Sequence, residues 1–266
     1  MPRELVPPGG ALAPYLAGLG WWATDLPAGR ERRLPTGGMQ LVVNLAADEV
    51  RWYDADGREH RRGGAVVCAA TPGPVTIDTA DQRMVICVPF RAGGAYSVLG
   101  VPATALDEPV VELAALWGRT AVTLRERLLA AGGPSAAVWE LRRTLTRRLG
   151  RGPGHDPAVP AAAAALDRGM AVADVADRLG LTAAGLRRRF AVGTGLTPKR
   201  YARIRRLQRL LRHLPDAPVD WSAVAVGGGW YDQAHLIHDF REFTGGTPGA
   251  YQPRSATEPN HLPVVR

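Results

Sequence analysis

Side chains that could hydrogen-bond to the edges of DNA bases occur at matching places in two related segments of this chain. Arg187 and Arg188 lie in the first segment, and Gln233, His235 and His238 lie in the second. A guanidinium can bond O6 and N7 of guanine together, and a side-chain amide can do the same with adenine. Such readout needs a rigid element that carries these side chains into a groove. The chemistry therefore depends on the elements that position them.

The two segments share one pattern of residues. The spacing between equivalent positions is 49 residues at the start and 50 from Leu186 onward, so one residue is inserted at the turn. A glycine suits that turn because it accepts a positive φ at low cost. The pattern predicts a helix, a glycine turn and a second helix, twice over. The matching residues are Ala176, Gly180, Leu186, Phe190, Gly195, Thr197, Pro198 and Tyr201, then Ala225, Gly229, Leu236, Phe240, Gly245, Thr247, Pro248 and Tyr251.

In the first unit we expect a helix over 172–179 and a second helix over 183–191, with Thr182 as its N-cap. Leu186 and Phe190 would face the core. The second helix of such a unit enters the major groove and meets base edges with its outward residues. The residues predicted to face the bases are Ala184, Arg187 and Arg188.

In the second unit Asp232 is the predicted N-cap of a helix that runs to Phe243. A long helix over 199–214 joins the two units, and six arginines lie along it. Only one side of that helix can face DNA, and we expect Arg205 to be its phosphate contact. The residues predicted to face bases in this unit are Gln233, Ala234, His235 and His238, and the predicted phosphate contacts of the whole module are Thr182, Arg205, Tyr231 and Thr247.

Each of these assignments has a simpler alternative. Arg188 is either a guanine reader or a solvated or phosphate-bound arginine, and for Arg187 and Arg189 phosphate contact or solvation is favoured. His235 and His238 are either groove contacts or solvated surface histidines.

The net charge of the chain is consistent with a polyanionic binding partner. The chain has 266 residues, a net charge of +8 and a pI near 10.3. The excess of positive charge lies on the repeat, since residues 158–266 carry a net charge of +6 and residues 1–157 only +2.

No apolar run approaches the ~18 residues that a membrane span needs, and the proline-broken N-terminus does not resemble a signal peptide. We expect a soluble cytoplasmic protein from a GC-rich bacterium, without membrane contact.

The first half predicts a different architecture. Short apolar runs separated by turn residues predict a small cupin-like β-barrel or sandwich, and Asp54 to Gly57 predicts a hairpin turn. The fold class is therefore α+β, and the predicted domains are a β-rich domain with a helical tail at 1–150, a linker at 151–157, the DNA-binding domain at 158–253 and a tail at 254–266. The predicted strands are 39–45, 50–53, 65–69, 75–78 and 84–88, and the predicted helices are 111–117, 121–129 and 135–149.

Trp21 and Trp22 in the first domain are either the lining of a ligand pocket or a packed aromatic pair. Cys68 and Cys87 lie in apolar runs and are expected to be buried free thiols. Only His60 precedes the linker, and no clustered ligand set is present, so no metal and no cofactor are expected.

The motifs of the two units resemble those of the AraC family of bacterial transcription regulators. The resemblance covers residues 158–253 and rests above all on the stretch from Tyr231 to Pro248, which reads YDQAHLIHDFREFTGGTP. Residues 35–116 also resemble an N-terminal domain of one branch of that family. The family's base-contact positions fall on Ala184, Arg188, Ala234 and His238.

The resemblance implies a regulator that binds double-stranded promoter or operator DNA, with an N-terminal domain that senses a small molecule, forms a homodimer, or both. An activator would also contact RNA polymerase; the sequence leaves activation and repression open. His238 stands where arginine is common, and Gly227-Gly228-Gly229 is a loose end for a helix.

The rival hypothesis is a DNA-targeted enzyme, such as a repair-type cysteine alkyl acceptor fused to the same DNA-binding module. Some relatives hold such a cysteine in a zinc site of several cysteines. Cys68 and Cys87 lack companions, and the chain contains no nucleophile elbow, phosphate loop or dinucleotide fingerprint. The sequence therefore favours a protein that is not an enzyme.

Overall fold

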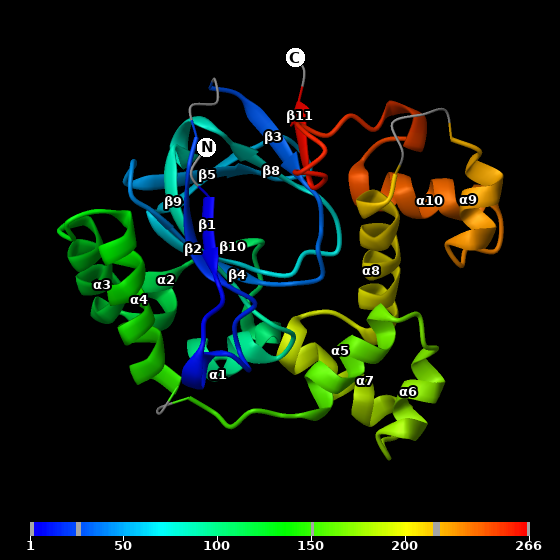
Figure 1. Ribbon diagram of the computed structural model, residues 1–266, viewed down its shortest axis with the longest axis horizontal. Coiled ribbons are helices and arrows are strands. Elements are labelled where there is room, and N and C mark those ends of the chain that lie inside the picture. The colour runs from blue at the N-terminus through cyan, green and yellow to red at the C-terminus, as the bar shows by residue number, and fades with distance from the viewer. Residues whose placement is uncertain (1–2, 25–27, 150–151, 215–218, 265–266) are drawn as a thin grey trace.

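Two antiparallel sheets make up the N-terminal domain and helices make up most of the remainder (Figure 1). The computed structural model describes residues 3–24, 28–149, 152–214 and 219–264. One sheet has the strand order β1-β2-β9-β4-β7-β10 and the other β11-β3-β8-β5-β6, so the predicted α+β class is confirmed. The strands are β1 (Arg3–Val6), β2 (Leu19–Ala23), β3 (Arg30–Arg33), β4 (Gln40–Asn44), β5 (Glu49–Tyr53), β6 (Glu59–Gly63), β7 (Ala65–Cys68), β8 (Val75–Asp78), β9 (Met84–Pro89), β10 (Val110–Glu112) and β11 (His261–Val264).

Alternation along the strands gives the first sheet two buried faces. Leu41 and Val43 of β4 pack into a core shared with the helices, and Val42 between them faces the second sheet. Helices α1 to α4 cover the first face, and α5 to α10 form a C-terminal helical module. The helices are α1 (Gly94–Leu99), α2 (Leu113–Trp117), α3 (Arg119–Leu129), α4 (Pro134–Leu149), α5 (Ala158–Asp167), α6 (Val172–Arg178), α7 (Ala183–Thr194), α8 (Pro198–Arg212), α9 (Trp221–Gly227) and α10 (Gln233–Thr244). No helix in the described ranges is long and apolar enough to cross a membrane.

The predicted elements of the N-terminal domain are largely observed. The five predicted strands correspond to β4, β5, β7, β8 and β9, and two of the predicted helices to α3 and α4. Gly57 has a φ of 79° in the turn between β5 and β6, as the hairpin requires. The predicted helix over 111–117 is wrong in its first part, because β10 pairs with β7 before α2 begins at Leu113.

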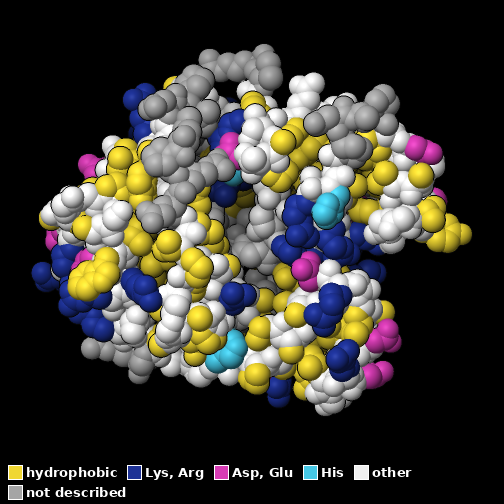
Figure 2. Space-filling view, in the orientation of Figure 1, with side chains coloured by type: hydrophobic (Ala, Val, Ile, Leu, Met, Phe, Trp, Pro, Cys, Tyr) yellow, Lys and Arg dark blue, Asp and Glu magenta, His cyan; other side chains and the backbone are white. Residues whose placement is uncertain are grey.

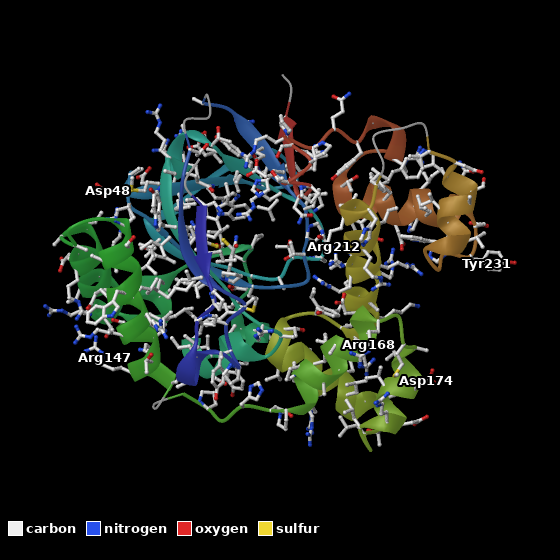
Figure 3. The ribbon with its side chains drawn as sticks, viewed as in Figure 1. Asp48, Arg147, Arg168, Asp174, Arg212 and Tyr231 are labelled. Atoms are coloured by element: carbon white, nitrogen blue, oxygen red, sulfur yellow. The ribbon has the colours of Figure 1, made fainter. Side chains whose placement is uncertain are left out.

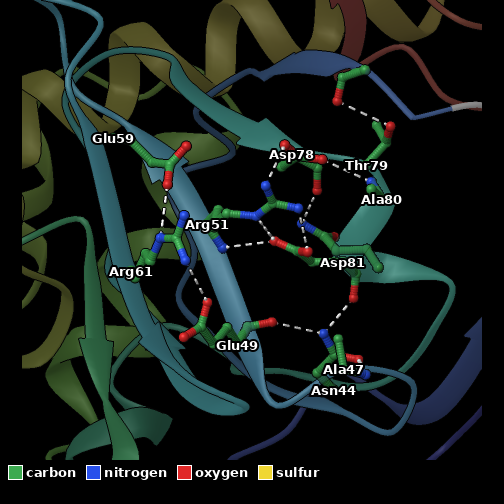
Figure 4. A network of polar contacts seen from close by, with 12 residues as sticks. Asn44, Ala47, Glu49, Arg51, Glu59, Arg61, Asp78, Thr79, Ala80 and Asp81 are labelled. Atoms are coloured by element: carbon green, nitrogen blue, oxygen red, sulfur yellow. Dashed lines mark hydrogen bonds and ion pairs between the residues drawn. The ribbon is translucent and has the colours of Figure 1, made fainter.

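A polar network fixes β5 of the second sheet (Figure 4). The guanidinium of Arg51 donates two hydrogen bonds of 2.7 Å to the carboxylate of Asp81, and Asp78 lies 3.6 Å away. These bonds raise the pKa of Arg51 further above its ordinary value. Buried Asn44 bonds the carbonyl oxygens of Glu49 and Asp81. The network ties β4, β5 and the turn after β8 into one unit.

The C-terminal helical module has its own core and also packs on the N-terminal domain. Its core includes Phe190, Phe240 and Phe243, all fully buried, and it takes in Leu34 from the loop after β3. Helix α7 contacts the short helix η3 (Ala103–Ala105) and α1. Residues 152–157 of the predicted linker carry no regular secondary structure.

The tail returns to the N-terminal domain. Strand β11 pairs antiparallel with β3, with His261 opposite Arg33 and Val264 opposite Arg30. The C-terminal end therefore lies beside the second sheet, and Leu262 of β11 also packs against the core of helices α5 to α10 (Figure 1).

Candidate DNA interface

The first helix-turn-helix unit comprises α6 and α7. Gly180 occupies the turn with a φ of 63°, and the hydroxyl oxygen of Thr182 caps α7 by accepting a 3.0 Å hydrogen bond from the Gly185 amide. Leu186 and Phe190 fix the inner face of α7 because both are buried. The cap and the inner face set the orientation of the outward side chains.

Ala184, Arg187 and Arg188 all lie exposed on the outward face of α7, as predicted. Neither Arg187 nor Arg188 has a hydrogen-bond or ion-pair partner among the described residues, so both guanidinium groups are available to DNA. Arg189 differs, because it lies 3.7 Å from the carboxylate of Asp156.

The second unit comprises α9 and α10 and repeats the geometry. Gly229 has a φ of 80° at the turn, and the Asp232 carboxylate accepts a 2.7 Å hydrogen bond from the His235 amide. Gly228 packs against Trp230, where a Cβ atom would lie 2.3 Å from the indole. Of the three glycines only Gly228 is tightly packed, since a Cβ atom at Gly227 or Gly229 would have no neighbour within 4 Å.

The outward residues of α10 differ in whether their side chains are exposed or already bonded within the protein. Ala234 and His238 are exposed, and the imidazole of His238 lies 3.9 Å from the Glu242 carboxylate. Gln233 accepts a hydrogen bond of 2.9 Å from Ser222. His235 is engaged within the protein, since its two ring nitrogens lie 3.4 Å from the Tyr231 amide and from the Arg206 guanidinium.

A buried carboxylate joins α8 to α10. Asp239 is fully buried and accepts hydrogen bonds from Arg203 at 2.5 Å, Arg206 at 2.8 Å and the Trp230 indole at 3.0 Å. Burial alone would raise the pKa of Asp239, but the two guanidinium groups and the indole outweigh it and lower the pKa. Arg203 also bonds Glu242. These arginines hold the second recognition helix, a role that the sequence analysis missed.

Arg205 is engaged within the protein. It was expected to contact phosphate, but its guanidinium donates a 2.7 Å hydrogen bond to Asp167 and a 3.2 Å bond to the carbonyl oxygen of Thr36. The physical reason is helical periodicity: Arg205 lies on the same side of α8 as Tyr201 and Gln208, which face the N-terminal domain. In this arrangement Arg205 joins the two domains.

The other predicted phosphate contacts lie near the recognition helices. Tyr231 has 89% of its surface exposed and projects from the outer end of the second unit (Figure 3). Thr247 precedes the short helix η4 (Pro248–Ala250) and is partly exposed.

A groove separates the two units and exposes the remaining basic face of α8. It encloses about 1030 Å³, and its lining includes Arg168, Lys199, Arg203, Arg206 and Arg209. Figure 2 shows Lys and Arg side chains gathered in this recess between the two helical lobes. The groove places positive charge between the two recognition helices.

The N-terminal domain holds the remaining candidate residues. Trp22 lines a cavity of about 730 Å³ between the sheets, and Trp21 faces the opposite core because side chains alternate along β2. Cys68 and Cys87 cannot pair, since their strands lie on either side of β4. Burial raises the pKa of the Cys87 thiol to about 12. Within the described residues, no group of three or more His, Cys, Asp or Glu side chains is arranged to hold a metal ion.

Two capped units of the same construction, joined by one basic helix, define a tandem helix-turn-helix DNA-binding module. Residues 175–254 match the family model described as a helix-turn-helix domain, and residues 4–112 match a domain of unknown function, DUF6597. The resemblance to the AraC family is confirmed: residues 175–254 form an AraC-type helix-turn-helix domain.

Solved structures with a similar fold include ToxT from Vibrio cholerae O395, which is 9% identical. That match covers 88% of this chain and 95% of ToxT, with a TM-score of 0.42. ToxT bound to (E)-4-(8-methylnaphthalen-1-yl)but-3-enoic acid gives a TM-score of 0.44 at 9% identity, with 88% and 96% covered. The AraC-like transcriptional activator CuxR is 16% identical, with 78% and 80% covered and a TM-score of 0.30. A search of curated proteins finds no match to this chain.

Proposed function

We propose that this protein is a sequence-specific transcription regulator in which α7 and α10 read two successive major grooves of promoter DNA. The observation that carries the proposal is that both recognition helices are capped and anchored from within while their outward faces stay exposed. In the proposal Ala184 and Arg188 meet base edges in one groove, and Ala234 and His238 do so in the next.

The groove between the units supports this assignment. A DNA duplex that passes both recognition helices presents its phosphates to the segment between them. Lys199 is exposed at the start of α8 and lines that groove, so it replaces Arg205 as the proposed phosphate contact of the joining helix. Thr182, Tyr231 and Thr247 remain proposed phosphate contacts beside the two helices.

The proposal extends to the N-terminal domain. A cavity of several hundred Å³ between its sheets supports a role in sensing a small molecule, with Trp22 in the cavity wall. A second copy of the chain, and RNA polymerase in the case of an activator, are the further partners in the proposal.

Selection of duplexes from a random pool by the full-length protein tests the function, followed by fluorescence anisotropy across a salt series. We expect an enriched sequence with two contacted blocks about one helical turn apart, bound 10³-fold or more tightly than a shuffled duplex. Binding that is equal on every duplex and lost steeply with salt would overturn sequence-specific recognition. Arg187→Ala is a matched comparison for Arg188→Ala, because both side chains are exposed on α7.

A further inference from the structure

The space between the two sheets of the N-terminal domain is a divided cavity. One compartment has a volume of about 570 Å³ and the other about 730 Å³, within the range typical of small-molecule sites. Much of the lining is apolar and includes Val42 and Ile77, which border both compartments. The two compartments also share Arg33 and Gln40, so these polar side chains stand at their junction.

The DNA-binding module and the tail that follows it each close this cavity at one place. The smaller compartment is bordered by Tyr201 and Arg205 of α8 and by Asp167 of α5. The larger compartment is bordered by the tail, from Arg254 to His261. A molecule held at the junction of the compartments would therefore lie between helices α5 and α8 of the DNA-binding module on one side and the tail on the other.

The tail is firmly attached where it borders the cavity. Besides the pairing of β11 with β3, the carboxylate of Glu31 is 3% exposed and bonds both Arg254 and His261. The side-chain amide of Gln208 on α8 donates a 2.7 Å hydrogen bond to Asn260. The tail thus connects the N-terminal sheet, the cavity wall and the helix between the two DNA-binding units.

Arg33 brings a positive charge into this cavity, and this charge is one of those that lower the pKa of Glu31. It lies two residues after Glu31 on β3, so both side chains face the cavity. Glu31 is already bonded by Arg254 and His261, and Arg254 also donates a 2.6 Å hydrogen bond to Glu258. Among the described residues the guanidinium of Arg33 has no hydrogen-bond partner and no carboxylate within 4 Å, although its backbone pairs with β8 and β11. The nearby thiols of Cys68 and Cys87 are neutral, because burial raises both pKa values.

A guanidinium in a cavity whose lining is largely apolar is best satisfied by a carboxylate or a similar anion, which it can bind with two parallel hydrogen bonds. The apolar lining on either side favours a ligand that also has an apolar body. Inorganic anions would leave that lining in contact with water, so the combination selects an organic anion.

We propose that Arg33 and the tail residues 254–261 form a composite site for a small organic anion with an apolar body. This inference rests on the proposed function, of which it names the effector class and the route of regulation. Because the tail is part of the wall, an occupied site holds the segment that directly follows the second helix-turn-helix unit. The effector would act on DNA binding through the tail as well as through α8.

Calorimetric titration of the full-length protein tests the site with carboxylates and their neutral amides as probes. The panel comprises octanoate, benzoate and 4-phenylbutyrate, each paired with its amide, together with inorganic phosphate. We expect at least one carboxylate to bind, and the Arg33→Gln variant to weaken that binding by about 10- to 100-fold without weakening the amide. Arg30→Gln is the matched control on the same strand, because Arg30 lies over the Tyr53 ring at 3.8 Å and does not line the cavity.

Several results would overturn the proposal. They are equal affinity for acid and amide, unchanged affinity in Arg33→Gln, tighter binding of phosphate than of every carboxylate, and no binding of any probe at millimolar concentration. Hydrogen exchange on the intact protein tests the tail without removing it. A bound carboxylate should slow exchange in residues 254–264, and slowing confined to the barrel strands would refute the tail's part in the site.

The same preparations distinguish this proposal from the proposed function. Sequence-selective DNA binding that persists when no probe binds Arg33 would refute only the composite site. Carboxylate binding that depends on Arg33, in a protein without sequence preference, would refute only the regulator.

Discussion

Replacing Asp239 with asparagine should release the second recognition helix while leaving the first in place. Asp239 is the common acceptor of Arg203, Arg206 and Trp230, and none of its surface is exposed. The change keeps the size of the side chain and removes its charge, so two guanidinium groups lose their counter-ion. Breaking a buried ion pair from one side costs about 3–5 kcal/mol.

The expected loss of stability lies near the lower end of that range. The side chains of Arg203 and Arg206 are 22% and 18% exposed, so water recovers part of the lost interaction. We therefore expect a loss of about 3 kcal/mol, which corresponds to roughly 100-fold faster opening of α10 if the loss is local to the second unit.

Native-state hydrogen exchange measures this effect directly. Amides of α10 should exchange faster in Asp239→Asn, and those of α7 should not change. Asp174→Asn is the matched control, because Asp174 is exposed on α6 (Figure 3). In the DNA-binding assay the variant should still discriminate among the base pairs contacted by α7 but no longer among those contacted by α10. Unchanged exchange in α10, or equal loss in both units, would refute the idea that this carboxylate anchors the second unit.

Three further predictions concern single side chains. Arg188→Ala should reduce discrimination at one base pair by about 1–3 kcal/mol, measured on a duplex series with single substitutions; an equal loss on every duplex would indicate a phosphate contact instead. Lys199→Gln should reduce the slope of log K against log salt by about 0.9, whereas Arg205→Gln should leave the slope unchanged; the opposite result would return Arg205 to the DNA surface. The free energy of unfolding should fall as the pH drops below the ordinary aspartate pKa of 3.8, because Asp239 has a lowered pKa in the folded state and stabilises it only when ionised. Asp239→Asn should flatten that acid dependence in urea titrations, and an unchanged pH profile would contradict it.

Much of the DNA-binding module could be predicted because its signals are local. Caps such as Thr182 and Asp232, and turn glycines such as Gly180 and Gly229, act on backbone groups within a few residues. The predicted helices consequently agree closely with α6, α7, α8 and α10. Strands β4, β5, β7, β8 and β9 were also predictable, because each is a short apolar or alternating run between turn residues.

The missed features depend on contacts between distant parts of the chain. Strand β3 has the sequence Arg-Glu-Arg-Arg, which carries no apolar pattern, and its partner β11 lies some 230 residues away. The side of α8 on which Arg205 lies was likewise set by packing against the N-terminal domain, since arginines occur on several faces of that helix. The anchoring role of Asp239 could not be predicted either, because its three hydrogen-bond partners come from α8 and from the turn before α10.

The pairing of β11 with β3 also constrains the order in which the molecule can form. Strand β3 is synthesised well before β11, so one edge of β3 stays open while more than 200 residues are added. An unpaired edge can join another chain, although the charged residues of β3 reduce that risk. A pairing between such distant segments also forms slowly, because a long loop must close first. The sheet on which the proposed sensing depends is therefore complete only after residues 261–264 have been synthesised, and a chain that stops before them leaves the sheet one strand short.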